Sequence, residues 1–96
     1  MKYIAFSEYD LSNRGKMAPR AQVIENDMKE NPDKYPSMIF YPHNMGGGTK
    51  SVSIIEANEE QLLYFRAMWM PLNKFEFIPL YELSKLRNAK EQAAIE

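Results

Sequence analysis

The sequence predicts an α+β fold whose elements follow the order strand, helix, strand, strand, helix, strand. Two observations support this order. Short segments alternate apolar and polar residues, as half-buried strands do, and two longer segments repeat apolar residues at helical spacing. Prolines, glycines and capping residues separate these segments. With 96 residues, of which 45% are hydrophobic and 12% aromatic, the chain is expected to form a single domain with one modest core.

The first half of the chain predicts a strand, a helix and a second strand. Residues 2–9 alternate between two faces, and the turn-rich segment 10–16 ends this strand. Pro19 suits the first position of a helix, because the N–H that proline lacks would have no partner there. Residues 37–43 predict the second strand, and Pro42 favours a sheet edge because proline donates no ladder hydrogen bond. The apolar stripe of the helix is predicted from helical spacing: Met17, Ala21, Ile24 and Met28.

The second half repeats the same order of elements. The glycine-rich segment 44–49 predicts a flexible connection into a third strand over residues 51–57. Asn58 is expected to cap the second helix, with Gln61 at the position that completes a capping box. Residues 75–80 alternate again and predict the fourth strand.

Right-handed crossovers convert this order into a ferredoxin-like βαββαβ fold, a four-stranded antiparallel sheet with both helices on one face. The expected core covers residues 2–82, and a weakly amphipathic C-terminal helix over residues 84–95 follows it. The first and third strands are expected to be central, parallel neighbours. The aliphatic face is expected to pack against the helices: Ile4, Phe6, Val52, Ile54, Ile78 and Leu80.

The opposite face of the expected sheet is both apolar and rich in hydroxyl groups. It carries Tyr3, Ser7, Tyr9, Ser51, Ser53, Ile55, Phe75 and Phe77. A contiguous surface of this kind usually meets a partner or a ligand. Because symmetric dimers are the commonest assemblies, we expect a homodimer in which two such faces meet.

Three segments resemble a known family. Residues 53–57 (SIIEA), the helix that ends at Met68 and Trp69, and residues 75–80 (FEFIPL) are similar to the family called domain of unknown function 3303. The resemblance extends over nearly the whole expected core and implies a dimeric α/β barrel, in which two sheets enclose a central cavity. Relatives in that wider group include cofactor-independent monooxygenases, small isomerases and proteins that only bind ligands. The resemblance therefore implies a fold and no particular activity.

Three residues are candidates for acid–base catalysis: His43, Glu8 and Glu56. His43 is the only histidine, and an unperturbed histidine titrates near neutral pH, although a lone histidine at a strand end is more often a surface residue. Glu8 and Glu56 are expected to end parallel neighbouring strands on one face, where two close carboxylates raise the pKa of one of them. Alternatively, Glu56 only stabilises the N-terminus of the following helix.

A flat organic ligand needs a mainly apolar pocket with a few placed polar groups. The candidate ligand-binding residues are Tyr3, Ser7, Tyr9, Tyr41, Ser53 and Phe77. Aromatic residues also fill ordinary cores, so a purely structural role is an alternative for this set. Residues 46–48 lack the Gly-Lys-Ser/Thr ending of a phosphate-binding loop and predict a hairpin instead.

The composition excludes several classes of protein. The chain has no cysteine, which excludes disulfides and thiolate chemistry, and one histidine, which excludes metal motifs built on paired histidines. Its net charge of −1 argues against a nucleic-acid partner. No apolar segment is long enough for a signal peptide or a membrane span, so we expect a cytoplasmic protein without a membrane partner. No residue pattern indicates a cofactor.

The leading hypothesis for function is a homodimer that binds a small apolar or aromatic molecule in a cavity between its two sheets. The alternative is a cofactor-independent monooxygenase or isomerase that uses the same cavity, with His43 or a carboxylate removing a proton while Tyr9 or Tyr41 positions the substrate. An RNA-recognition module shares the order of elements, but the expected third strand lacks the aromatic residues that stack bases. A structural dimer without a ligand is a further alternative.

Overall fold

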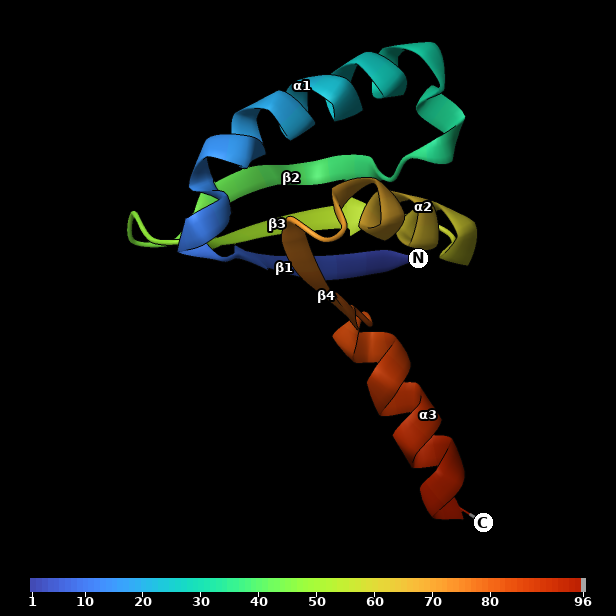
Figure 1. The fold of residues 1–96 in the computed structure, drawn as a ribbon. Helices are drawn as coiled ribbons and strands as arrows, with labels where there is room; N and C mark the ends of the chain where they lie inside the picture. The colour runs from blue at the N-terminus through green and yellow to red at the C-terminus, as the bar shows by residue number, and fades with distance from the viewer. Residues whose placement is uncertain (96) are drawn as a thin grey trace.

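The computed structural model describes residues 1–95 and has the predicted α+β fold (Figure 1). A four-stranded sheet forms one layer, and two helices cover one of its faces. A third helix follows the last strand. The elements are β1 (Lys2–Tyr9), α1 (Arg14–Glu30), β2 (Ser37–Asn44), β3 (Lys50–Glu56), α2 (Glu59–Trp69), β4 (Asn73–Pro79) and α3 (Leu83–Ile95).

The sheet is antiparallel throughout, in the order β2-β3-β1-β4. The expectation that the first and third strands run parallel is therefore wrong. Helix α1 returns the chain so that β2 runs in the same direction as β1, and the β2–β3 hairpin then reverses it. As a result, Lys2 lies opposite Glu56 and Glu8 lies opposite Lys50.

The glycine-rich segment forms the hairpin between β2 and β3. Gly46 and Gly47 have φ values of 72° and 80°, a left-handed conformation that residues with a side chain rarely adopt. The Met45 N–H donates a hydrogen bond to the Lys50 carbonyl oxygen at 2.9 Å and closes the turn. β2 lies at the sheet edge, as Pro42 predicts.

Helix α1 begins at Arg14, well before Pro19, so the predicted helix start is wrong. The Asp10 carboxylate accepts a hydrogen bond from the Ser12 N–H at 3.0 Å and starts a 3-10 turn that runs directly into the helix. Pro19 therefore lies inside α1, where it provides no N–H donor for the Gly15 carbonyl. Gly15 and Pro19 are both exposed, which leaves that carbonyl accessible to water.

The core lies between the two helices and one face of the sheet. Ile24, Tyr35 and Phe65 form its centre, with exposed fractions of 3%, 3% and 6%. Ile24 belongs to the predicted apolar stripe of α1, and the other members of that stripe are partly buried. Helix α2 begins with the predicted capping box, in which Asn58 and Gln61 each accept a hydrogen bond from the other's backbone N–H.

The helices cover the opposite face of the sheet from the one expected. Ala5, Ser53 and Ile55 lie at the centre of the covered face, with exposed fractions of 1%, 5% and 0%. Phe75 and Phe77 of β4 pack into the core from the same face. The reason is steric, because small side chains at the centre of a sheet leave room for the bulky aromatic side chains that the helices contribute.

Helix α3 follows β4 and extends away from the rest of the molecule (Figure 1). The radius of gyration is 16.2 Å, compared with about 13 Å for a compact domain of this length. Leu83 and Leu86 of α3 are 70% and 55% exposed. Within residues 1–95, no helix combines the length and the apolar character that crossing a membrane requires.

Candidate functional site

The uncovered surface of the sheet, here called the open face, is the first candidate site. Ile4 of β1 lies opposite both Ile54 of β3 and Ile78 of β4, and Phe6 lies opposite Val52. Cross-strand partners share one face of a sheet, so these side chains form a continuous apolar surface. The apolar residues of the open face are Ile4, Phe6, Phe40, Val52, Ile54, Ile78 and Leu80.

The apolar side chains of the open face remain in contact with solvent. Phe40, Ile78 and Leu80 expose 41%, 40% and 40% of their surface, and the side chains nearer the centre of the face are partly exposed. Burying apolar surface is favourable by about 25 cal/mol for each Å² that is removed from contact with water. A contiguous patch of this kind is typical of a surface that binds a partner or a ligand.

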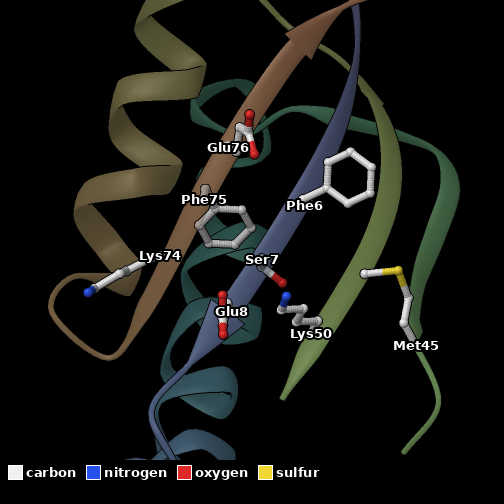
Figure 2. Close-up of a pocket in the computed structure, with 8 residues that line it drawn as sticks. All are labelled: Phe6, Ser7, Glu8, Met45, Lys50, Lys74, Phe75 and Glu76. Atoms are coloured by element: carbon white, nitrogen blue, oxygen red, sulfur yellow. The ribbon is translucent and has the colours of Figure 1, made fainter. Parts of the chain in front are cut away.

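A hollow of about 470 Å³ lies at one end of the open face (Figure 2). Phe6 and Met45 provide apolar walls, and Glu8 of β1 lies opposite Lys50 in β3 and Lys74 in β4. Figure 2 shows Lys50 directed toward β1, whereas Lys74 points away from the other side chains. The complete lining is Phe6, Ser7, Glu8, Met45, Lys50, Lys74, Phe75 and Glu76.

The structure separates Glu8 and Glu56, which were expected to meet. Glu8 lies opposite Lys50 at one end of β1, and Glu56 lies opposite Lys2 at the other end. At about 3.4 Å per residue, the two carboxylates are about 20 Å apart along the strand direction. Because the central strands are antiparallel, each carboxylate faces a lysine, and opposite charges across a sheet stabilise the pairing of the strands.

His43 lies at the edge of the open face. It is opposite Val52, and its ring stacks on Phe40 with 4.3 Å between the ring centroids and 11° between the planes. His43 Nδ1 lies 2.6 Å from the Tyr41 carbonyl oxygen. A carbonyl oxygen only accepts hydrogen bonds, so Nδ1 carries the hydrogen in this contact and Nε2 is the basic nitrogen. Tyr41 itself is 69% exposed.

Two of the predicted ligand-binding residues, Tyr3 and Phe77, lie on the covered face. Tyr3 is opposite Ile55, which is fully buried. The Phe77 ring stacks on Phe75 at 5.5 Å, and the Arg66 guanidinium lies 4.8 Å from its centroid. Phe77 therefore packs in the core between the sheet and the helices, and Tyr3 is partly buried on the same face of the sheet.

Three other predicted ligand-binding residues, Ser7, Tyr9 and Ser53, meet around a second cavity, here called the covered cavity. It lies between the sheet and the helices and has a volume of about 230 Å³. Trp69 and Asn73 also line it, and neither is among the site residues predicted from the sequence. The full lining is Ser7, Tyr9, Met17, Pro42, Ser51, Val52, Ser53, Phe65, Trp69, Asn73 and Phe75.

A cluster of hydrogen bonds around Asp27 joins α1 to α2. The Tyr35 hydroxyl donates to Asp27 Oδ2 at 2.6 Å, the Tyr64 hydroxyl donates to the same oxygen, and Asn31 Nδ2 donates to Oδ1 at 2.9 Å. The bonds from Tyr35 and Tyr64 hold the pKa of Asp27 below its ordinary value. Burial, followed by the hydrogen bond to Asp27, raises the pKa of Tyr35. Since the cluster connects two helices, its role is structural.

Within residues 1–95, no group of three or more histidine or carboxylate side chains is placed to hold a metal ion. The chain matches no protein-family model, no curated protein and no solved structure. Candidate functions therefore rest on the geometry of the open face and of the covered cavity.

Proposed function

We propose that the chain forms a homodimer through its open face and binds a small apolar or aromatic molecule between the two sheets. The observation that supports this proposal is the continuous apolar surface around Ile4 and Phe6, which no helix covers. Two sheets that pack face to face lie about 10 Å apart and bury their facing side chains. A two-fold axis brings such a surface against its own copy.

The charges around the open face favour a second copy as the partner. Glu8 is flanked by Lys50 and Lys74 at one end of the face, and Lys2 is opposite Glu56 at the other. Each end thus presents both signs of charge, so a copy related by a two-fold axis can place lysines against carboxylates at either end. A partner of one strong charge would leave half of these groups unpaired.

The position of α3 also supports a second copy. Helix α3 leaves the sheet at the end of β4, next to β1, and projects away from the rest of the molecule (Figure 1). At about 1.5 Å per residue it is about 20 Å long, twice the spacing of two packed sheets, so it is long enough to contact a copy packed on the open face. The helix is basic and the whole chain has a net charge of −1, so the rest of the chain is acidic and attracts it. The charged residues of α3 are Lys85, Arg87, Lys90 and Glu91.

The hollow beside Phe6 is the proposed ligand site. A facing sheet would enclose it, and its volume of about 470 Å³ lies within the range of about 300–1,000 Å³ that is usual for ligand pockets. Phe6 and Met45 suit the apolar body of a ligand, while Glu8 and Lys50 suit one polar group. The resemblance to the domain of unknown function 3303 family implies the same arrangement and stays a prediction.

Native mass spectrometry of the freshly purified protein tests both parts of the proposal. We expect a dimer that retains a small organic molecule. The variant Met45→Trp fills the hollow and should keep the dimer but lose the molecule, whereas Leu63→Trp, on the exposed surface of α2, should keep both. A dimer without a bound molecule would contradict the ligand part, and a monomer would contradict both parts.

An enzyme built on the same cavity, a cofactor-independent monooxygenase or an isomerase, is the second candidate. His43 supports it, because this side chain adjoins the open face and its Nε2 is available to accept a proton. Once the retained molecule is identified, its conversion by the wild type and by His43→Gln tests this candidate. Equal rates for the two proteins would contradict a role for His43 as the base.

A further inference from the structure

Three serines form the sheet side of the covered cavity. Ser7 of β1 lies opposite Ser51 of β3, and Ser53 follows two residues later in β3, so all three side chains belong to the covered face. Their small size leaves space between the sheet and the helices that larger side chains would fill. The cavity therefore has a floor of hydroxyl groups, here called the serine floor.

The hydroxyl of Ser53 is unpaired and has free space beside it. Ser53 is 5% exposed, and within residues 1–95 the only serine hydroxyl in a hydrogen bond is that of Ser12. Among the same residues, Asn73 Oδ1 is the only buried side-chain oxygen that lacks both a partner and free space. The unpaired Ser53 oxygen therefore keeps free space, and beneath the helices that space is the cavity. Since folded proteins pair nearly all of their buried polar groups, this hydroxyl indicates a bound group.

The remaining walls of the cavity are mainly aromatic and carry no charge. Phe65 and Trp69 of α2 and Phe75 of β4 line it. Of the described residues around the cavity, none has a charged side chain. An ionised ligand would lose its hydration here without gaining a counter-ion, which is strongly unfavourable. Aromatic walls with a few placed polar groups are typical of sites for flat organic molecules, so the cavity suits a neutral one.

We propose that the covered cavity binds a neutral single-ring aromatic molecule whose hydroxyl group pairs with the serine floor. A serine hydroxyl both donates and accepts hydrogen bonds, and so does the hydroxyl of a phenol. A dry cavity of about 150 Å³ holds benzene. The covered cavity, at about 230 Å³, therefore accommodates one ring with one or two small substituents.

This site differs from the one proposed between two sheets. The covered cavity lies within a single chain, beneath the helices, whereas the hollow beside Phe6 opens on the other side of the sheet. Binding in the covered cavity therefore does not require a second copy. The two proposals can fail separately.

The test compares p-cresol with p-xylene by isothermal titration calorimetry. The two probes have the same shape and differ by a hydroxyl group in place of a methyl group. A purely apolar cavity prefers p-xylene, because its methyl group gains more from leaving water. A cavity that pairs with the hydroxyl prefers p-cresol, and we expect a preference of at least about tenfold. The NMR signal of the Trp69 indole N–H should shift as p-cresol binds, because Trp69 is the only tryptophan and lines the cavity.

Variants locate the probe. Ser53→Ala removes one hydroxyl without adding volume and should weaken p-cresol binding by about three- to tenfold, the range expected for one hydrogen bond, with p-xylene unaffected. Ser84→Ala, the same change at an exposed position on α3, should leave both affinities unchanged. Met45→Trp fills the hollow beside Phe6 and should also leave p-cresol binding unchanged.

Three results would overturn the proposal. They are no binding of p-cresol to the wild type, equal or tighter binding of p-xylene, and loss of p-cresol binding in Met45→Trp, which would place the probe in the hollow. The comparison of the two probes in the wild type needs no variant, so it decides the proposal even if Ser53→Ala does not fold. Ordered water would then be the partner of the serine floor.

Discussion

Phe6 of β1 lies directly opposite Val52 of β3 on the face of the sheet that no helix covers. This pair lies between the apolar row through Ile4 and the charged row through Glu8. A second copy that covers the open face has to contact both the apolar row and the edge of the charged row. The Phe6–Val52 pair is therefore the point at which the proposed interface is most sensitive to a buried charge.

The substitution Phe6→Lys should weaken the dimer. Burying an unpaired ammonium group between two sheets is strongly unfavourable, so we expect the dissociation constant to rise by at least about 100-fold. Sedimentation velocity over a range of concentrations measures it. The control is Val23→Lys, which makes a similar change at a 54% exposed position on α1 and should leave the dimer intact. Equal effects of both variants would exclude the open face as the interface.

Helix α3 is predicted to contribute to the same dimer. Leu86 is 55% exposed, and a carboxylate in its place removes the apolar contact with the flank of the second copy. We expect Leu86→Asp to weaken the dimer about tenfold. Asn88→Asp adds the same charge on the opposite side of the helix and should have little effect. Identical dissociation constants for the two variants would show that α3 does not contact the partner.

Asp27 is predicted to make the fold sensitive to acid. The hydroxyls of Tyr35 and Tyr64 lower the pKa of Asp27 in the folded chain below its ordinary value of 3.8. The ionised carboxylate therefore contributes to the free energy of unfolding above pH 3.8, and this contribution is lost as the pH falls further. The free energy of unfolding should fall less between pH 7 and pH 3 in Asp27→Asn than in the wild type. Urea unfolding at both pH values measures this difference. Asp33→Asn, on the exposed surface, should behave like the wild type.

Tyr35 is predicted to make the stability of the fold decrease at alkaline pH. Burial and the hydrogen bond to Asp27 raise the pKa of Tyr35 in the folded chain above its ordinary value of 10. The protonated hydroxyl therefore contributes to the free energy of unfolding below pH 10, and this contribution is lost as the pH rises further. The variant Tyr35→Phe should lose less stability between pH 9 and pH 11 than the wild type. Chemical denaturation at the two pH values measures the loss. A wild-type loss no larger than that of Tyr35→Phe would contradict the prediction.

Arg66 connects α2 to β4 through two contacts. Its Nη1 donates to the Phe75 carbonyl oxygen at 2.6 Å, and its guanidinium lies over the Phe77 ring. Lysine keeps the charge but lacks the planar group, so Arg66→Lys should lower the free energy of unfolding by about 1–2 kcal/mol. Urea denaturation at pH 7 gives this value. A change within experimental error of zero would mean that neither contact stabilises the fold.

The order of the elements was predictable because local signals define it. Asn58 and Gln61 form the expected capping box, and Pro42 lies in an edge strand as expected. The start of α1 was not predictable from Pro19, because the hydrogen bond between Asp10 and Ser12 starts the chain turning earlier. Local patterns thus identify elements more securely than their ends.

The prediction of which sheet face the helices cover was wrong, because the face with more aliphatic residues was expected to be the buried one. Ala5 and Ser53 are buried for their small size, which the hydropathy of single residues does not reveal. The structure places the predicted site residues differently from the expectation. Ser7 and Ser53, expected at a cavity between two sheets, line the covered cavity between the sheet and the helices instead. The antiparallel direction of the central strands separates Glu8 from Glu56.

Two features of the candidate sites had no sequence signal. Tyr35 lies beyond the end of α1 and Tyr64 belongs to α2, so no local pattern connects these two tyrosines with the Asp27 carboxylate that they share. Asn73 looks like an ordinary turn residue, and only its burial beside Trp69 marks it as unusual. Contacts between distant segments depend on the folded structure and not on local pattern.

The measurement that tests the central claim most directly is sedimentation equilibrium of the wild-type chain at neutral pH. The proposed interface through the open face predicts a species of twice the chain mass of 11.2 kDa, and predicts that Phe6→Lys shifts it to a single chain. A wild-type protein that remains a single chain at all concentrations would contradict the account. The open face would then need a different partner, and the proposed cavity between two sheets would not exist.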